Sequence, residues 1–285
     1  MHTVERIGKR FWYMTPFSET DRPILGMVVG DHKTLMIDAG NSEKHAQHFL
    51  NELLKKEVTH PDLVVLTHWH WDHIFGLSAL TKAVSISSKQ TKMQIEKLIH
   101  LSWSDQALDE RVKKGTEIEF CATAIKKEFT DNRDITIVLP DLTFEKQIEI
   151  DLGGVTCIVQ QVGGNHASDS VIVLIKEEKI LFLGDCIYPD IFSEKENYTI
   201  NETLQLLDRL EAFDADTYVL SHWKPISKAE FSKEVMMLRK IAGYTDIFKG
   251  EKQQIIEHYE KDVARKLTDD ELATITEFVN GYEFK

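Results

Sequence analysis

Four potential metal ligands lie within six consecutive positions of the chain. Residues 67–73 have the sequence Thr-His-Trp-His-Trp-Asp-His, which includes His68, His70, Asp72 and His73. On a helix, residues 68 and 70 would point to different sides, whereas on a tight loop their side chains can converge. Imidazole and carboxylate groups bind zinc or iron without help from sulfur. Four such groups at these offsets indicate a metal-binding loop, although a single histidine would not.

The elements before this loop predict a mixed β-sheet with helices outside it. Residues 63–66, Leu-Val-Val-Leu, are typical of a strand buried on both faces. A helix is expected over 42–56, capped by Asn41 or Ser42, because its apolar residues recur every three or four positions. Earlier apolar runs predict strands at 11–14, 24–29 and 34–37. This order favours an α/β fold.

The rest of the chain predicts a second group of strands interrupted and followed by helices. A short helix and a strand are expected over 74–85, and a mainly helical insert over about 88–130. Further strands are predicted at 135–139, 144–150, 155–162, 171–175, 180–183 and 218–220, with a helix at 201–211 and helices at about 226–285. We interpret residues 1–285 as a single domain; in the alternative, the insert and the C-terminal helices form a second domain.

The loop motif His68-x-His70-x-Asp72-His73 resembles the signature of the metallo-β-lactamase-fold superfamily. Residues similar to the family's later ligands also follow predicted strands, in the segments Gly163-Gly164-Asn165-His166, Gly184-Asp185 and Ser221-His222. The resemblance spans residues 10 to 225. It implies an αβ/βα sandwich of two mixed β-sheets with outer helices, a fold that collects strand ends at one edge.

The resemblance also implies a dinuclear metal site. Its first group would be His68, His70 and His166, its second group Asp72, His73 and His222, and Asp185 would bridge them. The expected cofactors are two divalent ions, zinc before iron or manganese, sharing a hydroxide whose pKa they lower. The implied function is a metallo-hydrolase that attacks an acyl, lactone or thioester carbonyl, with Asp72 and Tyr188 as the predicted catalytic residues.

Tyr188 bears on the substrate because it lies three residues after Asp185. In the acyl-homoserine-lactone lactonase branch of the superfamily, a tyrosine at this offset polarises the substrate carbonyl; the alternative is an aromatic ring packed on the loop. From His166 the chain continues His-Ala-Ser-Asp-Ser, whereas lactonases and glyoxalase-II-like thioesterases commonly have His-Thr-x-Gly-His. This departure leaves the substrate class open.

Several neighbours of these motifs have two interpretations. Asp38 either orients a ligand or caps the following helix. Trp69 and Trp71 are expected to pack in the core in preference to lining the pocket. Among the histidines outside the motifs, His45 and His48 are predicted to be solvated on the 42–56 helix. The Cys186 side chain is expected to be a buried, inert thiol.

Composition restricts the partners and the location. The chain has 34 basic and 47 acidic residues, a formal charge of −13, which disfavours nucleic acid and therefore a nuclease or phosphodiesterase. Three cysteines without a framework spacing indicate a reducing compartment, and no apolar run reaches membrane-spanning length. A cytoplasmic enzyme with a small-molecule substrate is expected, its pocket roofed by the insert and the C-terminal helices.

Three further functions are less favoured. A di-iron or mono-iron oxidoreductase would use the same ligands, but no flavin-binding domain is evident to supply electrons. A non-catalytic binding protein is disfavoured because all seven ligand-type residues are present. An exported β-lactamase is disfavoured because the N-terminal segment does not resemble a secretion signal.

Overall fold

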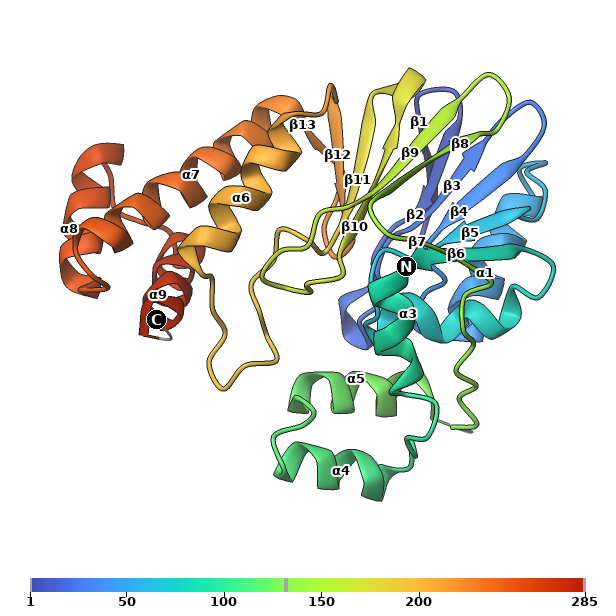
Figure 1. Cartoon of the computed structure of the whole chain (residues 1–285), viewed down its shortest axis with the longest axis horizontal. Coiled ribbons are helices and arrows are strands. Elements are labelled where there is room, and N and C mark those ends of the chain that lie inside the picture. The colour runs from blue at the N-terminus through green and yellow to red at the C-terminus, as the bar shows by residue number, and fades with distance from the viewer. Residues whose placement is uncertain (1, 131–132, 284–285) are drawn as a thin grey trace.

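The computed structural model describes residues 2–130 and 133–283 of the chain. Two β-sheets face each other, and helices cover their outer faces (Figure 1). The predicted αβ/βα sandwich of two mixed sheets is confirmed. Fully buried side chains from both sheets meet between them, among them Phe11, Val65, Val159 and Phe182. Burying this apolar surface is the main favourable contribution to pairing the sheets.

The first sheet has the strand order β1-β2-β3-β4-β5-β6-β7. Strands β1 to β4 pair antiparallel, and β4 to β7 pair parallel. Their bounds are β1 Val4–Ile7, β2 Phe11–Met14, β3 Leu25–Val29, β4 Thr34–Ile37, β5 Leu63–Val65, β6 Val84–Ser88 and β7 Leu142–Phe144. Because β4 and β5 run in the same direction, the loops after them leave the sheet at the same edge.

The second sheet has the order β13-β12-β11-β10-β9-β8, and only β11 and β12 pair parallel within it. Its strands are β8 Gln147–Asp151, β9 Thr156–Gln161, β10 Val171–Ile175, β11 Ile180–Gly184, β12 Thr217–Leu220 and β13 Ile226–Ser227. The loops after β9, β11 and β12 therefore emerge together. Backbone hydrogen bonds from Val171 to Thr67 (2.8 Å) and from Ile24 to Ser221 (2.7 Å) join this edge to the first sheet.

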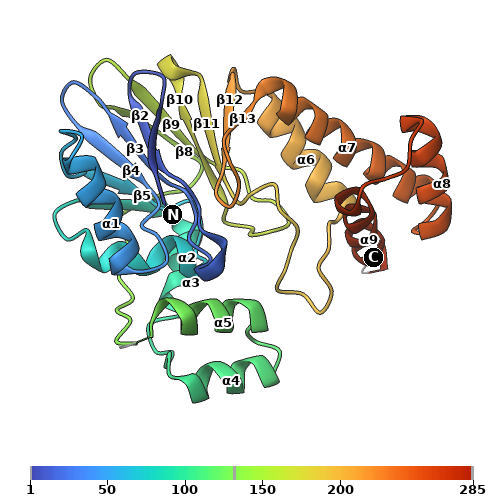
Figure 2. The ribbon, with the colours of Figure 1, turned by 180° about the vertical axis from the view of Figure 1, so that it is seen from behind.

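Helices form the two outer layers (Figure 2). Helices α1 Glu43–Leu54, α2 Trp71–Ile74 and α3 Lys89–Glu96 lie nearest the first sheet, and α4 Asp105–Lys113 and α5 Glu119–Glu128 lie below the sandwich in both views (Figure 1 and Figure 2). Those beside the second sheet are α6 Ile200–Glu211, α7 Lys228–Ile247, α8 Lys252–Val263 and α9 Asp269–Glu283. Within the described parts of the chain, no helix is long and apolar enough to cross a membrane.

Two strand predictions were wrong. Residues 135–139 are irregular, because their apolar side chains pack against the helical layer of the first sheet without pairing as a strand. The run 144–150 is not one strand: Phe144 ends β7 in the first sheet, and β8 begins at Gln147 in the second. An apolar run identifies burial but not the hydrogen-bonding partner, so it cannot show that the chain changes sheets.

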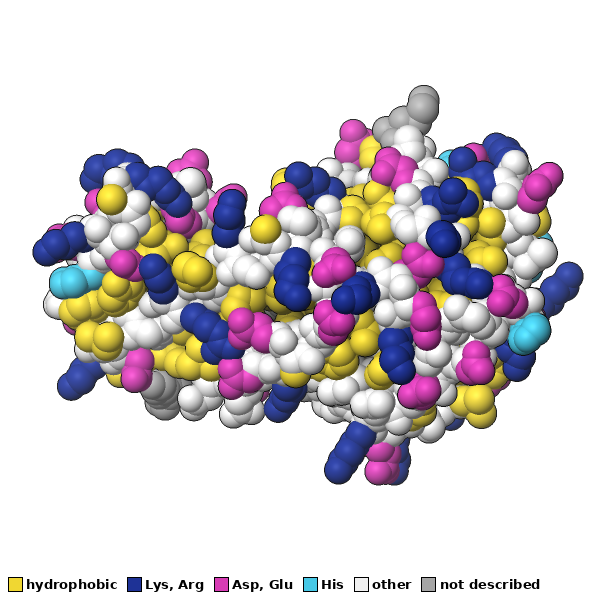
Figure 3. Space-filling view, turned by 90° about the horizontal axis from the view of Figure 1, so that it is seen from above, with side chains coloured by type: hydrophobic (Ala, Val, Ile, Leu, Met, Phe, Trp, Pro, Cys, Tyr) yellow, Lys and Arg dark blue, Asp and Glu magenta, His cyan; other side chains and the backbone are white. Residues whose placement is uncertain are grey.

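The edge opposite the strand-end loops carries hairpin turns and a mixture of charges. The turns before β4 and β9 meet there, where the Asp31 amide donates to the carbonyl of Gly153 (2.7 Å). Figure 3 shows basic and acidic side chains interspersed over this face. Such a surface is typical of a solvated exterior. The candidate metal ligands instead gather at the opposite edge.

Helix α9 supports the long loop between β11 and α6. The Tyr198 amide donates to the Glu277 carbonyl (3.1 Å), and the Tyr198 ring stacks on Phe278 with centroids 5.0 Å apart. Burial, and then the neighbouring carboxylate of Glu196, raise the pKa of Glu277 to about 7. Helix α9 therefore fixes this loop but places an acidic group where ionisation is unfavourable.

We expect Glu277→Gln to stabilise the protein at alkaline pH. Because the folded-state pKa of Glu277 is raised, the wild-type protein loses stability as pH rises from the unfolded value through about 7. After allowance for partial exposure, the variant should melt about 2 °C above wild type at pH 8. The gain should largely vanish by pH 5. Thermal unfolding at both pH values measures this, and an equal shift at both would contradict the prediction.

Candidate metal centre

The loop after β5 and the helix α2 that follows it together place four side chains at the strand-end edge. Helix α2 starts immediately after His70, so that Asp72 and His73 lie on its single turn. The following Gly76 lies against the 38–40 loop, where an added Cβ would be 2.0 Å from the carbonyl oxygen of Ala39. This close approach fixes the loop against the sheet.

Three histidines converge into a first group. The Nδ1 atom of His70 lies 3.0 Å from Nε2 of His68 and 2.9 Å from Nε2 of His166. All three side chains are buried, and burial lowers the pKa of each ring. Burial therefore disfavours the charged form of each ring, and a cation between these three nitrogen atoms would satisfy the arrangement.

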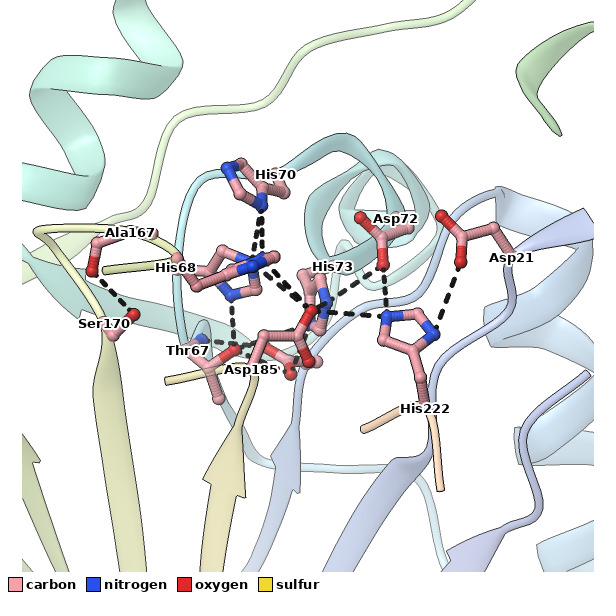
Figure 4. Close-up of polar contacts among 12 residues, drawn as sticks. Asp21, Thr67, His68, His70, Asp72, His73, Ala167, Ser170, Asp185 and His222 are labelled. Atoms are coloured by element: carbon pink, nitrogen blue, oxygen red, sulfur yellow. Dashed lines mark hydrogen bonds and ion pairs between the residues drawn. The ribbon is translucent and has the colours of Figure 1, made fainter. Parts of the chain in front are cut away.

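A second group contains Asp72, His73, Asp185 and His222 (Figure 4). The Nε2 atoms of His73 and His222 lie 3.0 and 3.1 Å from Oδ2 of Asp72. Burial opposes protonation of both rings, but the surrounding carboxylates outweigh it and raise the pKa of each well above its usual value. The carboxylates thus create a place that favours positive charge.

Asp185 lies between the two groups. Its Oδ2 atom is 3.3 Å from Nε2 of His73 and of His222, 3.4 Å from that of His166 and 3.8 Å from that of His68. Its other oxygen, Oδ1, is buried and accepts no hydrogen bond from the described residues. This unpartnered carboxylate oxygen and the nitrogen–oxygen donor set fit divalent cations, which these two groups would hold.

Asp38 orients His73 and Thr67. Its carboxylate accepts hydrogen bonds from the Thr67 amide (2.7 Å) and hydroxyl (2.9 Å), and its Oδ2 lies 2.8 Å from Nδ1 of His73. A proton held on Nδ1 leaves Nε2 of His73 free to face the second group. Of the two interpretations of Asp38, the structure supports the orienting role.

Asp21 has the corresponding position beside His222 and was missed by sequence analysis. Its Oδ1 lies 3.4 Å from Nδ1 of His222, and its backbone has a positive φ of 54°. Burial and then the charge of Asp72 raise the pKa of Asp21 to about 7. No motif contains Asp21; its only local signal is the turn before β3, since aspartate tolerates this conformation better than most residues.

We expect Asp38→Asn to weaken metal binding without unfolding the protein. The asparagine amide has one acceptor oxygen in place of two, so it cannot accept all the hydrogen bonds that Asp38 accepts from Thr67 and His73. The His73 ring therefore loses its fixed orientation. Metal affinity should fall by about 10-fold to 100-fold, as for other outer partners of metal ligands. Titration of the metal-free variant by calorimetry measures this. Asp62→Asn, which removes a carboxylate bonded to Thr34, is the control and should bind as wild type does.

The two groups lie at the base of a cavity of about 780 Å³. Helix α5 contributes Phe120 and Cys121 to it, in agreement with the predicted role of the insert. The expectation for the C-terminal helices was wrong: among the described residues that line the cavity, none comes from α7 to α9. These helices pack behind α6 and the long loop, so the loop itself forms that wall.

Some residues near the metal-ligand motifs differ from the sequence predictions and others agree with them. His45 is buried, not solvated, because it lies on the face of α1 that packs beneath Gly40. His48 is exposed, as predicted. Trp71 is buried in the core and also borders the cavity, so the two interpretations are not exclusive. Cys186 is buried and burial raises the pKa of its thiol, which agrees with an inert residue.

The fold and these convergent ligands define the class of the protein. A family model of the metallo-beta-lactamase superfamily matches residues 23–222, and the chain belongs to this superfamily. A metallo-beta-lactamase from Pontibacter korlensis has a similar structure, with a TM-score of 0.58, 19% identity, and coverage of 83% of this chain and 98% of that one. DIM-1 metallo-beta-lactamase is also similar, with a TM-score of 0.56, 16% identity, and coverage of 82% of this chain and 95% of that one. At this identity the likeness shows the fold alone.

Two curated relatives are also similar in sequence. The linear primary-alkylsulfatase of Pseudomonas sp. (strain ATCC 19151) is 21% identical over 242 residues, which are 76% of this chain. The match spans only 44% of that relative's length. The acyl-coenzyme A thioesterase MBLAC2 of Gallus gallus is 25% identical over 216 residues, covering 70% of this chain and 73% of the relative. Both names describe hydrolases, in agreement with the predicted enzyme class.

Proposed function

We propose that this protein is a dinuclear metal-dependent hydrolase that cleaves a carboxylic ester, lactone or thioester of a small molecule. The observation that carries the proposal is the position of the Asp185 carboxylate between two groups of ligands at the base of a large cavity. Seven residues from distant parts of the chain converge there. This arrangement supports two cations close enough to act on one substrate.

The donor set favours zinc. His68, His70 and His166 would hold one ion, Asp72, His73 and His222 the other, and Asp185 both. Imidazole and carboxylate also suit iron or manganese, so metal analysis must decide among them. When bound, two such cations would polarise the substrate carbonyl and lower the pKa of a water molecule.

The chain's own groups orient the reaction. Burial raises the pKa of Tyr188, so its phenol stays protonated and can donate a hydrogen bond to the substrate carbonyl oxygen. The ring lies between His166 and His222, with centroid distances of 6.2 and 6.3 Å. Asp72 borders the cavity and can accept a hydrogen bond from the attacking water. Water supplies hydroxyl to the acyl carbon and a proton to the leaving group.

The cavity and the relatives support a small ester-like substrate over a nucleic acid. Most of its lining is apolar, and its charged residues are mainly acidic: Glu5, Asp21, Asp72, Asp185 and Glu196 against Arg22 and Lys224. Two bound cations would offset Asp72 and Asp185, but the rest of the lining offers only Arg22 and Lys224 to the phosphates of a nucleic acid. The two curated relatives are named for cleaving an alkyl sulfate and an acyl thioester.

The test is an activity panel on protein whose metal content has been measured by mass spectrometry. A lactone, a thioester, a phosphodiester and a β-lactam are offered to wild type and to His68→Ala. We expect hydrolysis of the lactone or thioester, and its loss in the variant together with bound metal. Cleavage of the phosphodiester alone, or unchanged activity in His68→Ala, would overturn the proposal. An iron content with an optical absorption band would favour the oxidoreductase.

A further inference from the structure

Large aromatic side chains are exposed at the walls of the cavity. Phe120 on α5 is 57% exposed and Trp223 on the rim is 59% exposed, although both are large and apolar. Ile191 and Phe192 add apolar surface from the loop between β11 and α6. Contiguous exposed apolar surface around a concave site is typical of a place that binds an apolar ligand.

The wall formed by this loop is fixed before any ligand binds. The Asp190 carboxylate accepts a hydrogen bond from the Phe192 amide (2.8 Å), and the Tyr198 hydroxyl donates to the carbonyl of Ile187 (2.9 Å). Helix α9 adds the stacking of Phe278 on Tyr198. A preformed wall loses little entropy on binding, so an apolar chain placed against it gains most of its burial energy.

Lys224 places a cation at the rim next to Trp223. Its Nζ lies 3.9 Å from the nearest carboxylate given by the structure, that of Glu230, whose other oxygen accepts hydrogen bonds from Ser227. The other basic residue lining the cavity, Arg22, is bound by two hydrogen bonds to Glu128. Lys224 is therefore the basic group of the lining that can best accept a ligand anion.

The acidic residues of the outer cavity oppose such an anion only weakly. Glu5 accepts a hydrogen bond from the Tyr13 hydroxyl (2.6 Å), and Asp21 pairs with His222. Burial raises the pKa of Glu196 and so favours its neutral form. Lys224 itself is 67% exposed, so it can follow a ligand at the rim.

We infer that the substrate is an amphiphile, an ester or thioester whose apolar chain lies against Phe120, Ile191 and Phe192 and whose anionic group lies against Lys224. The inference rests on the proposed function and specifies its substrate class. Trp223, next to Lys224 in the chain, adds apolar surface beside the charged part. Hydrolysis breaks the C–O or C–S bond, adds the hydroxyl of water to the acyl carbon and gives the proton to the departing oxygen or sulfur.

Matched thioesters of 3-mercaptopropanoate and 3-mercaptopropanamide, with acyl chains of increasing length, test the inference. They have nearly the same shape and differ in one charge. For wild type we expect kcat/KM to rise about threefold for each added methylene until the apolar walls are covered. The anionic series should be preferred by about fivefold at low salt, the range of an exposed ion pair, and the preference should decrease with salt.

Three variants separate the parts of the inference. Lys224→Ala should lower kcat/KM for the anionic series about fivefold more than for the amide series, so that the preference for the anion is lost. The matched control Lys228→Ala, which lies outside the cavity, should behave as wild type. Phe120→Ala should flatten the dependence on chain length. An equal loss on both series in Lys224→Ala, or no dependence on chain length, would overturn the inference. Failure of wild type to cleave any ester or thioester would instead refute the proposed function.

Discussion

Asp185→Asn should reduce hydrolysis by about three orders of magnitude, since a bridging carboxylate supports several kcal/mol of transition-state stabilisation through its cations. The Asp185 carboxylate faces four imidazole rings, and its loss removes the negative charge shared by both groups. The neutral amide can coordinate only weakly through its oxygen. Bound metal should fall from two ions per chain to one or fewer, as measured by mass spectrometry.

Asp214→Asn is the matched control for this substitution. Asp214 pairs with Lys179 and its side chain is 73% exposed, so the same change of charge should alter neither metal content nor activity. Melting temperature and circular dichroism of both variants show whether the fold is kept. If Asp185→Asn kept two ions and activity within tenfold of wild type, the assignment of Asp185 as the bridge would be wrong.

Glu128→Ala should lower the free energy of unfolding by about 3 kcal/mol, because it leaves the half-buried Arg22 without its carboxylate partner. The Glu128 carboxylate is 2% exposed and binds Arg22 through contacts of 2.7 and 3.0 Å. It also accepts a hydrogen bond from Ser42, the N-terminal cap of α1. One side chain thus joins α5 to both the segment before β3 and the start of α1.

Urea unfolding measures the effect, and Lys126→Ala on the same helix is the control. Lys126 pairs with the exposed Asp109, so its removal should cost at most about 1 kcal/mol. Glu128→Gln keeps part of the hydrogen bonding and should fall between Glu128→Ala and wild type. A loss in Glu128→Ala no larger than that of the control would show that this buried pair does not stabilise α5.

Much of the site could be predicted because its residues follow strands. Apolar runs identified β5, β9, β11 and β12, and parallel strands necessarily present their ends at a common edge. The resemblance to the superfamily implied that His68, His166, Asp185 and His222 would meet, and their positions after these strands gave the physical reason. Their identity as metal ligands, like the single-domain interpretation, stays a prediction for the experiments above.

The features that sequence analysis missed depend on contacts between distant parts of the chain, which no local sequence pattern indicates. Asp21 reaches His222 from the far end of the chain, and α9 supports the loop of Tyr198 from the C-terminal region. Periodicity likewise gave no information about the buried environment of His45. Side chains with such long-range partners have no characteristic spacing, so their roles become visible only when the packing of the helical layers is known.

Both groups of ligands are divided between the two sheets. The first group takes His68 and His70 from the loop after β5 but His166 from the loop after β9, and the second is divided in the same way. Cations held there would cross-link the two halves of the sandwich. Resistance to unfolding would then increase with the logarithm of the free metal concentration, so that scarcity of the ion would expose the chain to proteolysis as well as stop turnover.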